Sequence, residues 1–117
     1  MKLGIMKLKK TESEDKVIYK ISGRIDTQSA PDLQDDIDAL FEKMKKENNN
    51  KIELILDFKD VEYTSSAGLR TILYTKKKID SMAAGSKFEI INIRPEIMEV
   101  FDMTGFSDFL SLNGSEN

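Results

Sequence analysis

The residues best suited to chemistry in this sequence are two adjacent serines, Ser65 and Ser66, in the stretch YTSSAGLR at residues 63–70. They follow an apolar run and precede a helix-like pattern, so they lie where a strand is expected to turn into a helix. Three interpretations fit hydroxyls at such a turn. They are an ordinary helix cap, the exposed nucleophile of a hydrolase, and a residue that receives a phosphate.

The hydrolase interpretation lacks the partners that a serine nucleophile needs. The segment TSSAG at residues 64–68 is similar to the G-x-S-x-G turn of serine hydrolases, but the first glycine is missing. A serine hydroxyl needs a neighbouring base, most often histidine, and the sequence contains no histidine. No lysine follows either serine at S-x-x-K spacing. We therefore expect no catalytic residue and no enzyme.

Metal and cofactor chemistry has equally little support in the sequence. Asp35 and Asp36 lie on an expected polar helix face, and Asp57 and Asp60 flank a turn, without a histidine or a dense carboxylate cluster beside them. Gly68 stands alone, outside any P-loop or G-x-G-x-x-G pattern. We therefore expect no bound metal and no cofactor.

The phosphate interpretation explains more of the turn than a cap alone. One serine is enough to cap a helix, which contributes about 1 kcal/mol. Here a second hydroxyl is present, followed by the small Ala67 and Gly68 and by no acidic side chain in the expected first turn. The positive end of a helix stabilises an added phosphate, and Arg70 is placed one turn further along to assist. Such a modification would change the surface and leave the core in place.

The elements that position this turn alternate between strand and helix patterns. Strand patterns occupy residues 5–12, 16–22, 52–58 and 88–93, and helix patterns follow Ser29, the serine turn and Pro95. Gly23 is expected to end the second strand, residues 24–27 to form a connection, and Ser29 to cap the first helix. The run at 52–58 is apolar on both faces, which favours a central strand. The order predicts an α/β fold with one mixed sheet and helices packed against it.

The size and composition of the chain indicate one ordinary globular domain. Its 117 residues are enough for a single core, and 39% are hydrophobic and 33% charged. Phe106, Phe109 and Leu110 are expected to fold back on that core, while residues 113–117 are expected to form a flexible tail.

Charge and hydropathy narrow the classes of partner. The net charge of -3 and the lack of a basic stripe argue against nucleic acid as a partner. No run approaches the ~18 apolar residues of a membrane span, so we expect no membrane insertion. The absence of cysteine is consistent with the cytoplasm, where we expect the protein to act.

Five motifs together resemble a known family. They are GRIDT at 23–27, APDL at 30–33, LDF at 56–58 with VEY at 61–63, SSAGLR at 65–70, and MTGF at 103–106. In this combination the chain resembles STAS-domain proteins of the anti-sigma factor antagonist type. The resemblance covers residues 6–110, and we assign a STAS domain to residues 1–112. It implies a mixed sheet of four or five strands with three to four helices.

The resemblance implies a protein that switches partners. In that family the unphosphorylated antagonist binds an anti-sigma factor that is also a serine kinase. Phosphorylation of one serine breaks the complex, and a serine phosphatase resets it. Alignment on Gly68 places the phosphoacceptor on Ser66, and Asp26 matches the family's partner-contacting aspartate. ATP and magnesium would belong to the kinase.

The resemblance also implies a docking face around the phosphoacceptor. We expect it to contain Asp26, Thr27, Ser65, Ser66, Ala67, Gly68 and Arg70. In it, Ser65 is expected to be the cap and Gly68 to let the partner approach closely. Ser65, Ala67 and Arg70 replace the aspartate, the serine or threonine, and the glycine that are frequent in the family. The alternative is a constitutive scaffold or regulatory subunit of a transporter or signalling complex, in which Ser66 is never modified.

Overall fold

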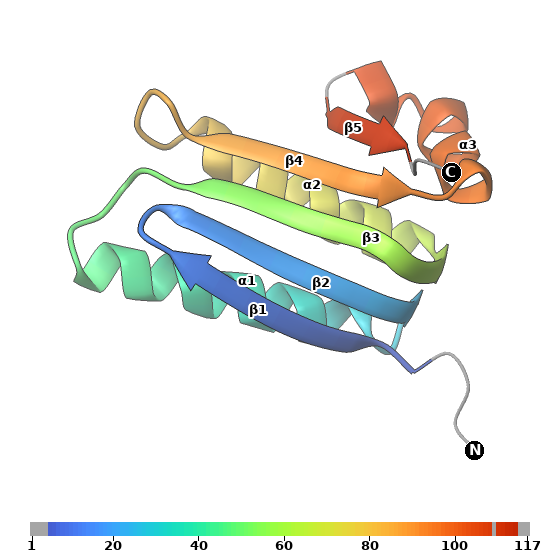
Figure 1. The fold of residues 1–117 in the computed structure, drawn as a ribbon, viewed down its shortest axis with the longest axis horizontal. Helices are drawn as coiled ribbons and strands as arrows, with labels where there is room; N and C mark the ends of the chain where they lie inside the picture. The colour runs from blue at the N-terminus through green and yellow to red at the C-terminus, as the bar shows by residue number, and fades with distance from the viewer. Residues whose placement is uncertain (1–4, 109, 115–117) are drawn as a thin grey trace.

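A computed structural model describes residues 5–108 and 110–114 of the chain as one sheet with helices packed against it (Figure 1). The elements in chain order are β1 (Lys7–Ser13), β2 (Lys16–Ile25), α1 (Ala30–Lys46), β3 (Glu53–Thr64), α2 (Ser66–Asp80), β4 (Lys87–Ile93), α3 (Pro95–Met103), the 3-10 helix η1 (Phe106–Asp108) and β5 (Ser111–Gly114). The predicted α/β fold is confirmed, since three α-helices and a five-stranded mixed sheet lie within the described ranges.

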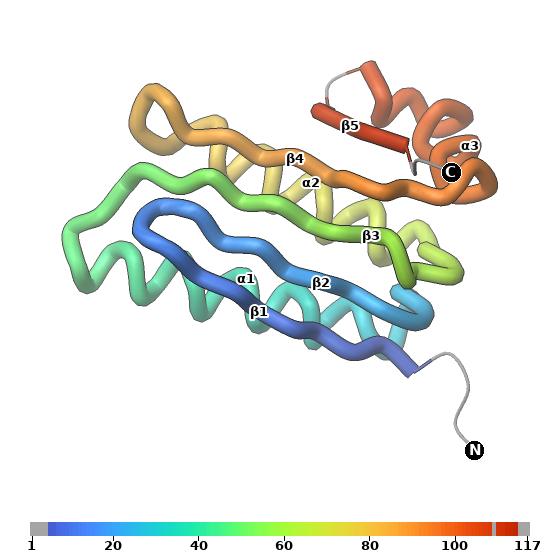
Figure 2. The backbone as a smooth tube through the Cα atoms, viewed as in Figure 1, coloured from blue at the N-terminus to red at the C-terminus, as the bar shows by residue number. Residues whose placement is uncertain are grey.

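The strands lie in the sheet in the order in which they occur in the chain, β1-β2-β3-β4-β5 (Figure 2). β1 and β2 form an antiparallel hairpin, and each later pair of neighbours is parallel. The predicted central strand is confirmed, because β3 pairs with β2 on one side and β4 on the other. The parallel pairing brings the carboxyl ends of β2 and β3 to the same end of the sheet.

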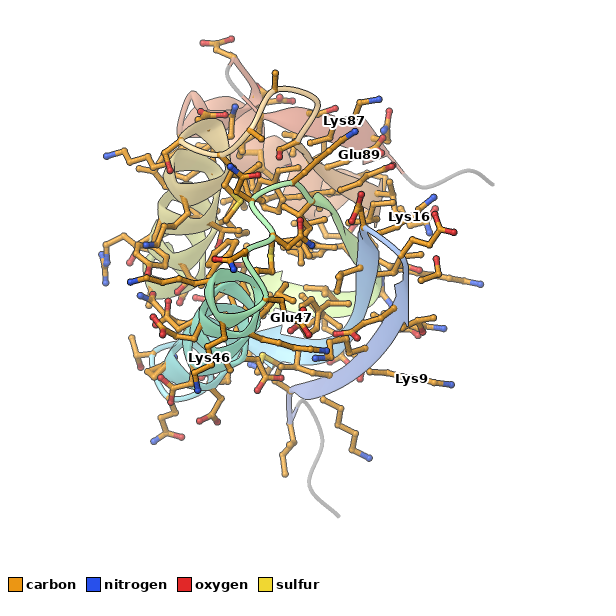
Figure 3. The ribbon with its side chains drawn as sticks, turned by 90° about the vertical axis from the view of Figure 1, so that its left-hand side faces the viewer. Lys9, Lys16, Lys46, Glu47, Lys87 and Glu89 are labelled. Carbon is orange, nitrogen blue, oxygen red and sulfur yellow. The ribbon has the colours of Figure 1, made fainter. Side chains whose placement is uncertain are left out.

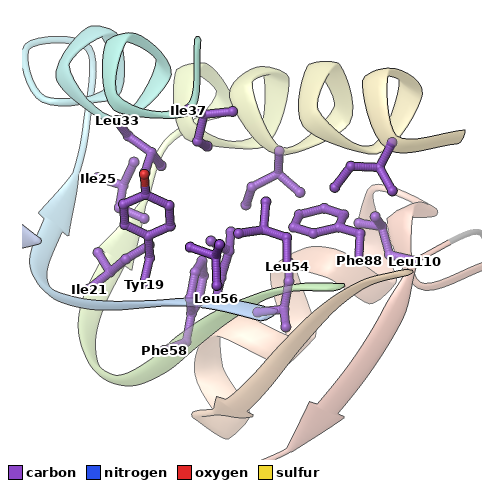
Figure 4. Close-up of a cluster of buried hydrophobic side chains, with 14 of the residues drawn as sticks. Tyr19, Ile21, Ile25, Leu33, Ile37, Leu54, Leu56, Phe58, Phe88 and Leu110 are labelled. Atoms are coloured by element: carbon purple, nitrogen blue, oxygen red, sulfur yellow. The ribbon is translucent and has the colours of Figure 1, made fainter. Parts of the chain in front are cut away.

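The helices α1 and α2 lie side by side on one face of the sheet and close most of the core (Figure 4). The strand predicted at residues 16–22 is present as part of β2 and alternates in burial, since Val17, Tyr19 and Ile21 are buried beneath these helices. α3 contributes a buried ring from Phe101, whose centroid lies 6.3 Å from that of Phe58 in β3. The largest side chains with almost no exposure are Tyr19, Phe58, Phe101, Ile21, Ile25, Leu33, Ile37, Ile52, Leu54, Leu56, Ile72 and Ile90.

Two predicted strand ends are wrong, and both corrections concern the end of the sheet that carries the serines. β2 continues through Gly23 to Ile25, because Gly23, at a φ of 88°, lies at a register shift rather than at a chain turn. β3 continues past Phe58 to Thr64. The two longer strands remain paired as far as Ile25 and Thr64. This pairing fixes where the connection after β2 and the serine turn begin.

The C-terminal residues pack more closely than the sequence suggested. Phe106 is partly buried against the core and Leu110 is 7% exposed, as expected of residues that fold back. Phe109 lies outside the described residues. Asn113 and Gly114, expected in the tail, belong to β5, which pairs with β4. The rest of the expected tail, 115–117, also lies outside the described residues.

The end of the sheet remote from the serines is covered by charges of both signs (Figure 3). Lys16 and Lys87 begin β2 and β4, and Lys46 and Glu47 lie at the end of α1. Such a mixture of charges is typical of a solvated surface. Within the described ranges, no helix has the length and apolar character needed to cross a membrane.

Candidate phosphoacceptor site

The serine turn is joined directly to the end of β2. The backbone N–H of Ser65 donates to the carbonyl oxygen of Ile25 over 2.8 Å. Ile25 is the last residue of β2, so the connection that starts at Asp26 lies beside the N-terminus of α2. Two parts of the predicted docking face, almost 40 residues apart in sequence, therefore meet at the carboxyl ends of two parallel strands.

The two adjacent serines have different roles in this turn. Ser65 has an extended backbone, and its Oγ accepts a hydrogen bond from the N–H of Gly68 over 3.4 Å, so it is the N-cap of α2 as predicted. Ser66 is the first helical residue, and its side chain is exposed. Its Oγ makes no hydrogen bond with any of the described residues. The hydroxyl of Ser66 is therefore the one available to a partner.

The first turn of α2 offers polar backbone to a negative group. Ser65 receives the N–H of Gly68 on its side chain and the N–H of Leu69 on its carbonyl oxygen. The N–H groups of Ser66 and Ala67 have no hydrogen-bond acceptor within the described ranges, as is usual for a first helical turn. No acidic side chain lies in this turn. A negative charge on Ser66 would therefore meet donors and no carboxylate of its own helix.

Gly68 has a different role from the one expected, because it is buried. A Cβ placed on it would lie 2.4 Å from Oγ1 of Thr64 and 2.7 Å from Cγ2 of Ile25. The missing side chain therefore lets α2 pack closely on the ends of β2 and β3. The expectation that Gly68 lets a partner approach is wrong, since the space above it is filled by this chain.

Asp26 is held in a fixed conformation by its own loop. Its Oδ1 accepts hydrogen bonds from the N–H groups of Gln28 and Ser29, both over 3.0 Å. The N–H of Ser29, then that of Gln28, the hydroxyl of Ser29 and the charge of Arg24 hold the pKa of the Asp26 carboxyl below its usual range. Asp26 therefore presents a negative charge, with Oδ2 free of hydrogen bonds to the described residues.

Ser29 organises this loop instead of capping α1. Its Oγ donates to the carbonyl oxygen of Arg24 over 2.8 Å and accepts the N–H of Asp26 over 2.9 Å. It makes no side-chain hydrogen bond to the helix that follows, so the predicted cap is wrong. The hydroxyl is used within the loop and not at the helix N-terminus, because Pro31 in the first turn of α1 has no N–H to cap.

A groove between α1 and α2 joins three of the predicted docking residues. Thr27, Ala67 and Arg70 line it together with residues of α1. The α1 side of the groove consists of Ala30, Pro31, Gln34, Asp35 and Asp38. Hydrogen bonds from Thr71 to Gln34 and from Tyr74 to Asp38, at 3.4 and 2.7 Å, connect the two helices along it. The predicted docking face therefore extends beyond Ser66 into a groove with acidic side chains.

The α1 residues of this groove were not predicted from the sequence. The helical spacing of Thr71, four residues after Ala67, is the one local signal for the α2 side. No local signal identifies the α1 side, because it depends on how the two helices pack against each other.

The site can accept a modification but has little means of catalysis. No base lies within hydrogen-bonding distance of the Ser66 hydroxyl among the described residues, so this hydroxyl is a weak nucleophile. Asp57 accepts hydrogen bonds from Asn92 and Lys59, whereas Asp60 pairs with Lys20. Across residues 5–108 and 110–114, no three acidic side chains come together as a metal site would require.

Comparison with known proteins gives a family and similar folds. The chain is 28% identical to the anti-sigma-B factor antagonist of Bacillus subtilis over 87% of this chain and 85% of that protein. Its fold is similar to the crystal structure of an anti-sigma factor antagonist from Mycobacterium paratuberculosis, with a TM-score of 0.76, 20% identity, and coverage of 94% of this chain and 86% of that one.

A third similar protein has been solved with a phosphate attached. It is the phosphorylated form of the Bacillus cell fate determinant SpoIIAA, with a TM-score of 0.64 and 14% identity over 92% of this chain and 90% of that one. The model of the STAS domain family matches residues 7–117. With the sheet and helices described above, this match shows that the chain belongs to the STAS domain family.

Proposed function

We propose that this protein is an anti-sigma factor antagonist that acts by switching partners. In its unmodified form it binds an anti-sigma factor that is also a serine kinase, through Ser66, Asp26 and the groove between α1 and α2. The kinase transfers the γ-phosphoryl group of ATP to Oγ of Ser66, which releases ADP and the hydroxyl proton. A serine phosphatase later hydrolyses the O–P bond with water and restores the serine.

The observation that carries this proposal is the state of the Ser66 side chain. It is exposed at the first position of α2, with an Oγ that has no hydrogen bond to the described residues. A phosphate of about -1.5 to -2 charge placed there would not disturb the buried contacts of the core. It would lie close to the loop that begins at the negative Asp26 and next to Ala67, which lines the groove. Repulsion and bulk at the centre of the docking face would then release the partner.

The names of the similar proteins indicate which process the switch regulates. The similar Bacillus and Mycobacterium proteins are described as anti-sigma factor antagonists, and the SpoIIAA structure is described as a phosphorylated form. On this basis the regulated process is transcription, the protein acts by binding and not by catalysis, and it works in the cytoplasm.

The test combines phosphate mapping with partner binding. The protein is incubated with the candidate kinase and ATP, and a phosphopeptide containing Ser66 is sought by mass spectrometry. Affinity for the kinase is then measured for the wild type, Ser66→Ala and Ser66→Asp. We expect Ser66→Ala to bind and never release, and Ser66→Asp to bind at least tenfold more weakly, which corresponds to about 1.4 kcal/mol.

A matched control uses Ser13, an exposed serine at the hairpin end of β1. Ser13→Asp adds the same charge at the opposite end of the sheet and should bind as the wild type does. Equal binding by the wild type and both Ser66 variants, with no phosphate on Ser66, would rule out the switch. That result would support a constitutive scaffold or regulatory subunit.

A further inference from the structure

The three arginines of the chain differ in the contacts of their guanidinium groups, and Arg70 is the one whose guanidinium is available to an anion. The guanidinium of Arg24 stacks over the ring of Tyr63, with its carbon 4.2 Å from the ring centroid. Nε of Arg94 donates to the carbonyl oxygen of Lys59 over 3.2 Å. Arg70 is exposed and makes no ion pair, ring contact or hydrogen bond with the described residues. Its charge is therefore available to a new anion.

The carboxylates that line the groove with Arg70 do not form ion pairs with it. Asp35 and Asp38 line the same groove, yet neither lies within ion-pair distance of the guanidinium. Asp38 already accepts the hydroxyl of Tyr74 over 2.7 Å.

The position of Arg70 on α2 directs it toward Ser66. The two residues are four apart in one helix, so they are neighbours on its surface, with Cβ atoms roughly 5–6 Å apart. Side chains of a helix lean toward its N-terminus, which carries a long side chain at Arg70 back over the turn that holds Ser66. An acidic group that precedes a basic one by four residues is also the more favourable order for a helical ion pair.

We propose that Arg70 is the phosphate-binding residue of this site: when Ser66 is phosphorylated, the guanidinium of Arg70 pairs with the phosphate across one turn of α2. This inference rests on the proposed phosphorylation of Ser66 and adds the residue that receives it. The planar guanidinium offers two parallel N–H donors to phosphate oxygens, which a glycine at this position would not provide.

The pairing changes the docking face at a second point. Arg70 lines the groove in the unmodified protein, together with Asp35 and Asp38, and it is the positive side chain among the described lining residues. A phosphate that binds it therefore withdraws that charge from the groove. Phosphorylation then alters the charge of the groove as well as the surface at Ser66. A partner that places an acidic side chain against Arg70 would lose that contact upon phosphorylation.

The experiment installs phosphoserine at position 66 during translation, so it needs neither kinase nor partner. The phosphate is titrated by phosphorus NMR in the wild type, Arg70→Gln and Arg70→Lys. A bound guanidinium favours the dianion, so removing it in Arg70→Gln should raise the second pKa of the phosphate by about half a unit. Arg70→Lys should fall between the two, because it keeps the charge without the fork.

The control is Lys77→Gln, which removes an exposed cation of the same helix. Lys77 lies eleven residues after Ser66, roughly 16 Å further along the axis. It should titrate within about 0.1 unit of the wild type, since such a distance exceeds the ~10 Å screening length at 0.1 M salt. The carboxylates near the site, Asp26 included, are the same in all four proteins and cancel in the comparison.

A second readout follows the arginines directly. Nitrogen NMR of the guanidinium groups should show that phosphoserine shifts Arg70 and leaves Arg94 unchanged. An Arg70→Gln titration equal to that of the wild type, or an unshifted Arg70 resonance, would overturn this inference and leave the proposed function intact. A phosphate–Arg70 pair in a protein that the kinase never modifies would support the inference and refute the proposed function.

Discussion

Replacing Gly68 with alanine is the most direct test of how α2 is seated on the sheet. The added Cβ would lie 2.4 Å from Oγ1 of Thr64 and 2.7 Å from Cγ2 of Ile25. Thr64 is 5% exposed and Ile25 is 0% exposed, so neither side chain has room to turn into solvent. The substitution therefore has to move α2 outward or distort both strand ends.

The expected change in unfolding free energy of Gly68→Ala follows from two opposing effects. Overpacking of a buried site costs about 1–3 kcal/mol. Alanine is favoured over glycine in a helix by up to about 1 kcal/mol. The net loss of unfolding free energy should be about 1–2 kcal/mol, which lowers the melting temperature of a domain of this size by roughly 4–8 °C.

The assay is urea unfolding of Gly68→Ala beside a matched glycine variant. Gly114→Ala is the control, because its Cβ would have nothing nearer than 3.8 Å and its φ lies outside the left-handed region. It should remain within about 0.5 kcal/mol of the wild type. Adding Thr64→Ala removes the nearer contact and should recover about 0.5 kcal/mol or more of the loss in the double variant. Equal stability of Gly68→Ala and the wild type would refute the packing role.

Three further predictions concern the same region and the core beneath it. Ser65→Ala removes the cap of α2 and should lower the unfolding free energy by about 0.5–1 kcal/mol in urea, at the low end because the hydrogen bond to Gly68 is 3.4 Å long; no change would show that the cap is not formed. Burial, with the charges of Asp36 and Glu12, raises the pKa of Tyr19 to about 12. The neutral Tyr19 hydroxyl therefore contributes stability that is complete below pH ~10 and is lost as the pH rises toward 12. Ultraviolet titration should show that Tyr19 ionises last, and a normal titration of all three tyrosines would contradict this. The lowered pKa of Asp26 stabilises the fold above the ordinary pKa of aspartate, and this contribution is lost as pH falls through the lowered value. Ser29→Ala removes the hydroxyl contact and keeps the backbone N–H, so carbon NMR should show the carboxyl titration moving part of the way toward the ordinary value; an unchanged titration would count against the hydroxyl contact.

Much of the site was predictable because its signals are local. The strand alternation around Tyr19 and the amphipathic helix patterns follow from which residue types recur at which spacing. A helix cap at this turn follows in the same way from a hydroxyl pair where a strand turns into a helix, although the assignment of the cap to Ser65 came from the family resemblance. These features involve residues within a few positions of one another.

The errors arose where one signal in the sequence competed with a contact that the pattern did not reveal. Gly23 looked like a strand end, yet pairing with β3 carries β2 through it as a bulge. Ser29 looked like a helix cap, yet its hydroxyl is used by Arg24 and Asp26 in the preceding loop. Asn113 looked like part of a tail, yet β4 offers it a strand partner. For Gly23 and Asn113 the deciding partner is another strand, whereas for Ser29 it is the preceding loop, which competes with the helix for the same hydroxyl.

The sequence by itself determined the order of the first four strands and the three helices, the amphipathic pattern of the helices, and a pair of hydroxyls where β3 turns into α2. The tertiary structure alone decided that Ile25 and Thr64 occupy the space beside Gly68, and that α1 and α2 enclose a groove in which Arg70 has no partner among the described residues. The physical reason is the distance along the chain over which each kind of interaction acts. Periodicity and capping act within one or two turns of chain, whereas the neighbours of a buried glycine or an exposed guanidinium depend on how separate elements pack against one another.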